Sequence, residues 1–450
     1  MFGPRTFVSG HYTVQRSEVP YHPVKMPSKV GINNKHIIKS VKTLLEKHGI
    51  LDKSTKISSS DGYSYIYSVA PVEDVESILD EYSDEIVVKE YLVPSAARSI
   101  SRSLESVVRA YLEDARAAGV DVNVDLLMSK LPRKWSIYTP MVLFNTGGFD
   151  SEIWTEVFAS SINASSFFNV VRAAFPATIT HFAINKPIVE EDVMRRPFNL
   201  VALHGDFGPE TSEVLFELPK PDDLEDAFWC HVVQNGIYQT WAPRYTMFSR
   251  GNITEKKRVL DNFKNLKGLV VMDFYAGIGY FTLSYLANGG TLLCWELNPW
   301  SIEGLVKGLS ENGYKYQVFS SGEFLTKEDY DRHLAQGVRA FVFHESNENV
   351  VTRLQQLGRL PVSHINLGLL PSLQASWSTV KTVRDQWTSR DIVVHVHENE
   401  HKDRFEQLLS KIGDYFEGEV IHFEKVKTFA PDIWHVVVDI GIGGGKEKEN

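Results

Sequence analysis

Apolar residues along this chain alternate between helical spacing and short continuous runs, a pattern of proteins that mix helices and strands. The first half predicts helices over residues 37–45, 95–119 and 154–175, with strands over 60–69 and 198–204. In the first of these helices the apolar residues on one face are Ile37, Ile38, Val41, Leu44 and Leu45.

The second half has shorter and more regular apolar runs. They predict strands over residues 269–272, 291–295, 340–343, 364–370, 391–396 and 435–440, and helices over 281–286 and 403–412. Strands that alternate with helices are typical of a parallel sheet. We therefore predict an α/β, Rossmann-like domain in the C-terminal half, preceded by an α+β region.

A length of 450 residues suggests two or three domains. We place an accessory region at 1–94, a middle α+β region and RNA contact at 95–238, and the Rossmann-like domain at 239–445. Pro94 marks the first boundary, because a new helical pattern begins after it.

Composition excludes several classes of protein. The net charge of −10 argues against non-specific coating of nucleic acid, although a local basic patch can still meet one structured RNA. Two cysteines, Cys230 and Cys294, are too few for a disulfide framework or a zinc site, so we predict reduced core residues and no metal. Without a leader or a long apolar run, we expect a cytoplasmic protein with no membrane contact.

The segment 269–299 combines the features of a nucleoside site. A strand ends at Asp273, a loop carries Gly277 and Gly279, and a second strand ends at Glu296, near the offset at which an acidic residue binds ribose hydroxyls. The loop D-F-Y-A-G-I-G lacks the third glycine of a dinucleotide fingerprint, which favours a nucleoside without phosphates, namely S-adenosylmethionine. The alternative is that the two glycines only form a tight turn.

Four motifs resemble the tRNA wybutosine-synthesizing protein 2 family: T-M-F-S-R-G-N-I-T-E-K-K-R-V, D-F-Y-A-G-I-G-Y-F-T, E-L-N-P-W and I-N-L-G-L-L-P-S. The resemblance is strong over 231–440, fainter over 131–208 and absent before Pro94. It implies transfer of the 3-amino-3-carboxypropyl group of S-adenosylmethionine to 4-demethylwyosine at position 37 of phenylalanine tRNA, with release of methylthioadenosine. The implied partner is the anticodon loop of this tRNA, and no obligate protein partner is inferred.

The resemblance also implies ligand contacts. Ser249 and Lys256 belong to a polar turn in which Thr254 is expected to cap a helix, and Glu296 is the ribose acid. A third contact follows the third strand, where Glu345, Ser346 or Asn347 is the natural candidate. An apparent insertion over 310–338 leaves Gly322 or Glu323 as the alternative.

The motifs give less information on the residues that would lie near the acceptor base. Related tRNA guanine-37 N1-methyltransferases carry a shorter N-x-P motif, whereas here more residues separate Asn366 from Pro371. His344, Glu345 and Asn366 lie near the expected acceptor, and His344 and Asn366 are the catalytic candidates, without an identified base. A guanine-N1-methyltransferase and a non-catalytic RNA-binding protein are the alternative functions.

Basic and histidine clusters complete the candidates. Arg133 and Lys134 beside Trp135 predict an RNA contact that combines charge with a stacking surface. Other candidate basic patches are Arg98, Arg102 and Arg109, then Arg195 and Arg196, then Lys256, Lys257 and Arg258. His395, His397 and His401 suggest a metal, but no carboxylate or cysteine completes a ligand set.

Overall fold

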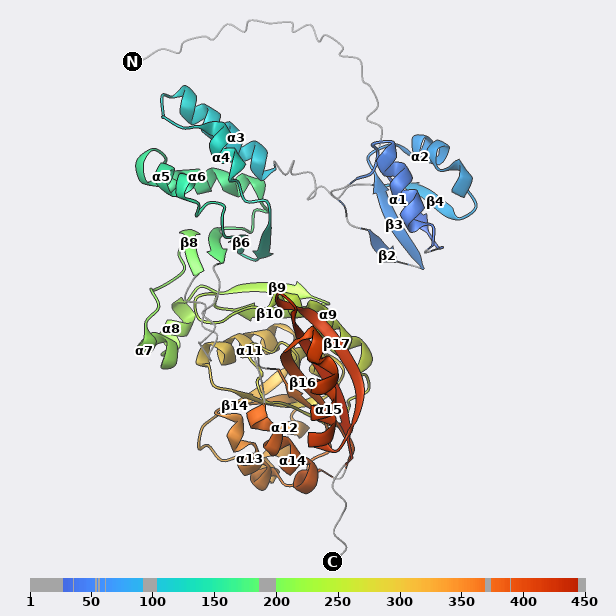
Figure 1. Ribbon diagram of the computed structural model, residues 1–450, viewed down its shortest axis with the longest axis vertical. Helices are drawn as coiled ribbons and strands as arrows, with labels where there is room; N and C mark the ends of the chain where they lie inside the picture. The colour runs from blue at the N-terminus through green and yellow to red at the C-terminus, as the bar shows by residue number, and fades with distance from the viewer. Residues whose placement is uncertain are drawn as a thin grey trace, which may run out of the picture. The chain divides into compact units, whose positions relative to one another are not determined.

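The computed structural model describes residues 27–34, 36–52, 55, 57–60, 62–91, 103–185, 200–368, 374–388 and 390–443. The chain divides into two compact units, one within residues 1–101 and one within 102–450 (Figure 1). The boundary predicted near Pro94, and the basic residues Arg98, Arg102, Arg195 and Arg196, lie outside the described residues.

The N-terminal unit is a four-stranded antiparallel sheet, in the order β2-β3-β1-β4, with two helices. Its elements are β1 (Ser28–Ile32), α1 (Ile38–Lys47), β2 (Ser58–Ser60), β3 (Tyr63–Ser68), α2 (Val72–Ile78) and β4 (Ile86–Glu90). Val41 and Leu45 of α1 and Val75 of α2 share one core with Val30 and Ile66 of the sheet. The predicted helix is confirmed, and the strand predicted over 60–69 is found as β3, preceded by the short β2.

The second unit begins with helices and a four-stranded sheet in the order β5-β6-β7-β8. Its elements are α3 (Leu104–Ala117), α4 (Val124–Ser129), β5 (Trp135–Tyr138), β6 (Met141–Asn145), α5 (Glu152–Ser160), α6 (Ala164–Val171), β7 (His181–Asn185), β8 (Leu200–His204), α7 (Glu213–Glu217) and α8 (Pro221–Asp226). Phe144, Phe149, Trp154, Phe167 and Phe182 form an aromatic core. The helical pattern predicted over 154–175 is divided into α5 and α6.

A hairpin leads from this region into the C-terminal sheet. β9 (Cys230–Gln234) and β10 (Ile237–Trp241) pair antiparallel, and Asn235 and Gly236 between them have φ of 54° and 80°. Positive φ at both central residues is the reason why Asn-Gly favours two-residue hairpins. The domain boundary placed before residue 239 falls inside β10.

The C-terminal sheet has eight strands in the order β13-β14-β12-β11-β15-β16-β18-β17. Its strands are β11 (Val270–Asp273), β12 (Thr291–Glu296), β13 (Lys315–Ser320), β14 (Val338–His344), β15 (Val362–Leu367), β16 (Ile392–His401), β17 (Glu419–Ala430) and β18 (Ile433–Ile442). The helices are α9 (Ile253–Asn262), α10 (Thr282–Ala287), α11 (Pro299–Glu311), α12 (Lys327–Ala335), α13 (Val350–Leu357), α14 (Trp377–Thr382) and α15 (Phe405–Phe416).

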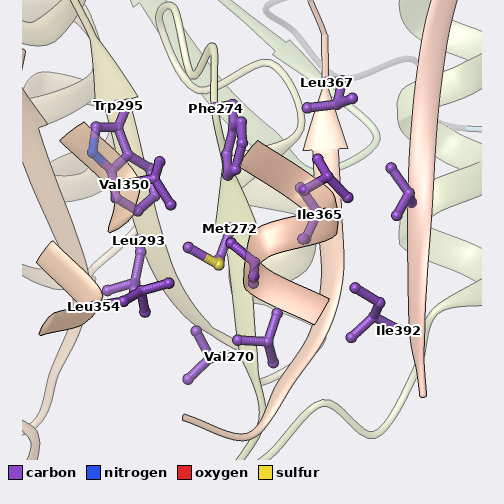
Figure 2. Packing of buried hydrophobic residues seen from close by; sticks show 14 of the residues in the cluster. Val270, Met272, Phe274, Leu293, Trp295, Val350, Leu354, Ile365, Leu367 and Ile392 are labelled. Carbon is purple, nitrogen blue, oxygen red and sulfur yellow. The ribbon is translucent and has the colours of Figure 1, made fainter. Parts of the chain in front are cut away.

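The six strands from β13 to β16 run parallel, and β18 pairs antiparallel with both β16 and β17. Helices cover both faces, so the central strands are buried throughout and contain almost continuous apolar residues. Figure 2 shows one such face, where Met272 of β11 lies between Leu293 of β12 and Ile365 of β15. The predicted Rossmann-like fold is therefore confirmed.

Three parts of this sheet differ from the sequence prediction. The apparent insertion over 310–338 contains β13 and α12, which add an edge strand and a covering helix. β16 and β18 are longer than the predicted 391–396 and 435–440. β17 was not predicted, because its burial along the strand is irregular and shows no clean alternation.

Candidate functional site

Two polar side chains meet at the carboxyl edge of the central strands. Asp273 ends β11, Asn366 lies opposite it in β15, and both are 1% exposed. The Nδ2 of Asn366 donates to Oδ1 of Asp273 at 3.0 Å, and the hydroxyl of Thr282 donates to Oδ2 at 2.7 Å. Burial raises the pKa of Asp273, while these two bonds oppose that rise.

Only one of the two polar atoms of the Asn366 amide has a hydrogen-bond partner. Its Nδ2 faces a carboxylate, which fixes the orientation of the amide, and its buried Oδ1 has no hydrogen-bond partner. A buried acceptor without a donor is unfavourable by about 1–3 kcal/mol. The atom is therefore suited to receive an N–H from a bound molecule.

The glycine loop joins this pair to Glu296. Gly277 and Gly279 have φ of 55° and 86°, a left-handed conformation that favours glycine in this turn. A Cβ on Gly279 would also lie 2.7 Å from Leu305 Cδ1. The half-buried carboxylate of Glu296 accepts the backbone N–H of Gly277 at 2.8 Å, and also those of the two residues that follow Glu296. Glu296 thus shapes the loop, and desolvation raises its pKa.

The three candidates for the third contact have different surroundings. β14 lies next to β12, which brings the segment after His344 close to Glu296. Asn347 Nδ2 donates to the carbonyl oxygen of Phe274 in the glycine loop at 3.0 Å. Ser346 caps a short helical turn by accepting the N–H of Glu348.

Glu345 is occupied elsewhere. Both of its carboxylate oxygens accept from the guanidinium of Arg353, at 2.7 and 2.8 Å, and both side chains are 3% exposed. Arg353 also donates to the carbonyl oxygens of Ser320 and Glu323, so it ties β13 to β14.

Gly322 and Glu323, the alternative candidates for the third contact, follow the edge strand β13, which β14 separates from β12. The Nε2 of His344 lies 3.2 Å from the carbonyl oxygen of Leu297.

Lys256 is an unusual cation because it is buried, with 3% exposure, in the first turn of α9. Its Nζ donates to Oε1 of Gln239 at 2.9 Å and of Gln234 at 3.2 Å. It also lies over the rings of Phe248 and Tyr280, at 4.4 and 5.2 Å from their centroids. Desolvation, together with a smaller effect of Lys427, lowers its pKa to about 7.

Lys256 is connected to the glycine loop. Gln239, which accepts from Lys256, donates its Nε2 to the carbonyl oxygen of Gly279 at 3.3 Å. Ser249 lies in the turn before α9, where its hydroxyl accepts from Lys427 Nζ at 2.9 Å. The structure therefore places Lys256 beside the same loop as Asp273 and Glu296, and Ser249 beside Lys427 of β17. Thr254 is not the helix cap: α9 begins at Ile253, so Thr254 already lies in its first turn.

The basic patch predicted at 256–258 is wrong as a surface feature, since Lys256 is buried and Arg258 is half-buried in ion pairs. Arg258 pairs with Glu255 at 2.7 Å and with Asp439 at 2.6 Å, and only Lys257 is exposed.

The candidate metal ligands His395 and His397 have other partners. His395 Nδ1 lies 2.7 Å from Asp439 and His397 Nδ1 lies 3.0 Å from His435 Nε2. Among the described residues, no group of three or more His, Cys, Asp or Glu side chains is arranged to hold a metal ion.

The predicted RNA contact lies before β5. Arg133 and Lys134 are exposed and line a cavity of about 220 Å³ with Leu131, Pro132, Asn145, Thr146, Gly147 and Gly148. Trp135 is half-buried, with its ring edge-on to Phe144 and Phe175, at 6.2 and 5.6 Å between centroids. The Trp135 ring is thus part of the aromatic core, and the exposed residues of the predicted RNA contact are Arg133 and Lys134.

Two residues of the site were missed by sequence reasoning. Gln239 lies in β10 and meets Lys256 of α9, and Lys427 lies in β17 and meets Ser249 in the turn before α9, in both cases only through the fold. The Asn-Gly pair between β9 and β10 is a sequence signal for this hairpin, and it could have placed Gln239 in a strand.

Among the described residues, no helix is both long and apolar enough to cross a membrane.

Comparisons with known proteins agree with the motifs. No protein-family model matches the chain. The tRNA wybutosine-synthesizing protein 2 of Saccharomyces cerevisiae is 34% identical over 93% of this chain and 98% of its own length. The protein of the same name from Schizosaccharomyces pombe is 33% identical, over 95% and 99%.

A solved structure shows the same fold. The crystal structure of P. horikoshii TYW2 in complex with MeSAdo covers 75% of this chain and 99% of its own, with a TM-score of 0.50 and 16% identity. The two fungal relatives establish kinship over almost the whole length, so the relationship also extends before Pro94, where the motifs showed no resemblance. The chain belongs to the tRNA wybutosine-synthesizing protein 2 family.

Proposed function

We propose that this protein transfers the 3-amino-3-carboxypropyl group of S-adenosylmethionine to 4-demethylwyosine at position 37 of phenylalanine tRNA, in wybutosine biosynthesis. The observation that carries the proposal is the match to wybutosine-synthesizing protein 2 over 98% of the length of the Saccharomyces cerevisiae protein. The chain is thus an S-adenosylmethionine-dependent transferase. We place the reaction in the cytoplasm, with the anticodon loop as the RNA partner.

The residues at the sheet edge fit S-adenosylmethionine. The co-substrate supplies a sulfonium whose neighbouring carbons are electrophilic. Glu296 at the end of β12 is suited to the ribose hydroxyls, and Asn347, which contacts the glycine loop, is the third contact we favour together with Ser346. Glu345 is less suited, because Arg353 occupies both of its oxygens.

Selection between methyl transfer and aminocarboxypropyl transfer depends on orientation, because both reactions start from the same sulfonium. We assign Lys256 to the carboxylate of the methionine moiety. Its ammonium is desolvated and is held by two amide oxygens and two aromatic rings, so an anionic ligand group would be a favourable partner. The free Oδ1 of Asn366 is suited to an N–H of the ligand or of the acceptor base.

We also propose that the region 95–238 contacts the tRNA, chiefly through Arg133 and Lys134. A truncated protein that begins at Gln239 would not test this cleanly, because the truncation cuts β10 and removes its partner β9. Substitution of both cations by glutamine in the full chain is the better test. We expect weaker tRNA binding, a smaller dependence on salt and unchanged S-adenosylmethionine binding.

The small product tests the reaction itself. The protein is incubated with S-adenosylmethionine and phenylalanine tRNA that carries 4-demethylwyosine, and the small molecules are analysed by mass. Methylthioadenosine is the expected product. S-adenosylhomocysteine would instead identify a methyltransferase, and the absence of both would identify a non-catalytic RNA-binding protein.

A further inference from the structure

One face of the sheet in the N-terminal unit carries a row of tyrosines. Val30, Ile66 and Val88 share the core with α1 and α2. Because side chains alternate along a strand, the intervening residues of β1, β3 and β4 point to the opposite face. At these positions stand Lys29 and Gly31 of β1, Tyr63, Tyr65 and Tyr67 of β3, and Val87 and Lys89 of β4, and Tyr91 follows β4.

The rings form two neighbouring pairs, and each pair is partly exposed. Tyr63 and Tyr65 lie 6.2 Å apart between centroids, and Tyr67 and Tyr91 lie 4.6 Å apart. All four are half-buried, so each ring retains accessible area. A Cβ at Gly31 would lie 2.9 Å from the ring of Tyr65, which shows that this ring lies across the neighbouring strand.

The charges on this face are positive. Lys29 and Lys89 are register partners on β1 and β4, and they are the charged residues among the outward positions of β1, β3 and β4. The Nζ of Lys29 lies 4.8 Å from the centroid of the Tyr65 ring. The acidic residues of α2, by contrast, belong to a helix that packs on the other face of the sheet.

We propose that this tyrosine face binds unpaired nucleotides of the RNA substrate, with bases stacked on the Tyr63 and Tyr65 rings and phosphates near Lys29 and Lys89. Aromatic rings beside cations are the usual composition of sites for single-stranded RNA, because every base has a π-face. Val87 is the aliphatic residue among the outward positions of β1, β3 and β4, so rings and cations make up most of this face. This inference relies on the proposed function only for RNA as the class of substrate.

Fluorescence anisotropy of labelled phenylalanine tRNA with the full-length protein tests the stacking. We expect the double variant Tyr63→Leu, Tyr65→Leu to lose about tenfold or more in affinity. The matched variant Tyr63→Phe, Tyr65→Phe keeps the rings and should bind like the parent. Lys29→Gln with Lys89→Gln should reduce the slope of log affinity against log salt by about one to two, whereas Lys39→Gln with Lys42→Gln on α1 should not.

Unchanged tRNA affinity in the leucine variant would overturn the proposal, as would equal losses in the leucine and phenylalanine variants. A lower melting temperature of the leucine variant with normal tRNA binding would also overturn it, in favour of a purely structural role of the rings. The release of methylthioadenosine is measured separately. Its absence in the parent protein would refute the transferase, while the tRNA affinities would still decide the role of this face.

Discussion

Replacing Lys256 by methionine should make the protein more stable and less active. In the ligand-free protein the ammonium is buried, with amide oxygens and aromatic rings around it. A fall in pKa from 10.5 to about 7 corresponds to about 5 kcal/mol, since one pKa unit is worth about 1.36 kcal/mol. Methionine has a similar length and removes this unfavourable charge.

The gain is partly offset by lost interactions. Without the ammonium, the buried Oε1 of Gln239 loses its donor, which costs about 1–3 kcal/mol, and the cation–π contacts are lost as well. We expect a net stabilisation of about 1–3 kcal/mol from these terms, seen as a higher melting temperature. Since the folded state binds fewer protons than the unfolded state, the gain is full below pH 7 and disappears toward pH 10.5.

Binding of S-adenosylmethionine should take up a proton. With a pKa of about 7, about one tenth of the Lys256 side chains are charged at pH 8, and pairing with the ligand carboxylate would charge the rest. Calorimetric titration in buffers of different ionisation enthalpy should therefore show an uptake of about 0.9 proton at pH 8 that Lys256→Met abolishes. Affinity should fall about tenfold from pH 6 to pH 8 for the same reason.

Lys257 provides the matched control. It is the next residue of α9, is exposed, and pairs with Asp261 at 2.6 Å. Lys257→Met should leave binding, proton uptake and turnover close to those of the parent, whereas Lys256→Met should lower kcat/KM at least tenfold, the value of one charge-assisted contact. Comparable activity of the two variants, or the same proton uptake in both, would refute the assignment of Lys256.

Further predictions concern the loop and the buried histidines. Glu296→Gln should weaken S-adenosylmethionine binding about ten- to a hundredfold in calorimetry, with less loss of melting temperature than Glu296→Ala, and unchanged affinity would argue against a ribose contact. Gly279→Ala should destabilise the protein by about 1–3 kcal/mol more than Gly313→Ala, because both have positive φ but Gly313 has open space around it; equal melting temperatures would contradict this. Burial lowers the pKa of His364 and His435 to about 3, so stability should fall as pH drops from 6.5 toward 3, by about 2 kcal/mol for each at pH 5, and His435→Gln should flatten the thermal stability profile.

Local patterns predicted the backbone structure around the glycine loop. The run from Val270 to Asp273 and the loop with Gly277 and Gly279 lie within a few residues of one another, and their conformations follow from apolar content and from the need for positive φ. The position of Glu296 followed from the regular length of a βα unit. These features depend on short stretches of chain, which is why sequence alone specified them.

Pairings between distant residues were not predictable in the same way. The carboxylate of Glu345 was available in the sequence, but its partner Arg353 becomes evident only when α13 packs beside β14. Lys256 was predicted as a ligand contact, but the charged residues beside it in sequence gave no indication of its burial. Its burial depends on Gln234 and Gln239, from a hairpin whose sequence signal was overlooked.

The ion pairs at the base of α9 explain how the fold keeps Lys256 buried without a carboxylate of its own. Two residues further along the helix, Arg258 pairs with Asp439 of β18, which also accepts from His395. This buried network joins α9 to the far side of the sheet across 181 positions of sequence. The geometry of the helix is thereby set by Arg258 and Asp439 and does not depend on the ammonium of Lys256. A rigid element can therefore hold an uncompensated cation at the glycine loop, where the missing negative charge is one that a ligand carboxylate can supply.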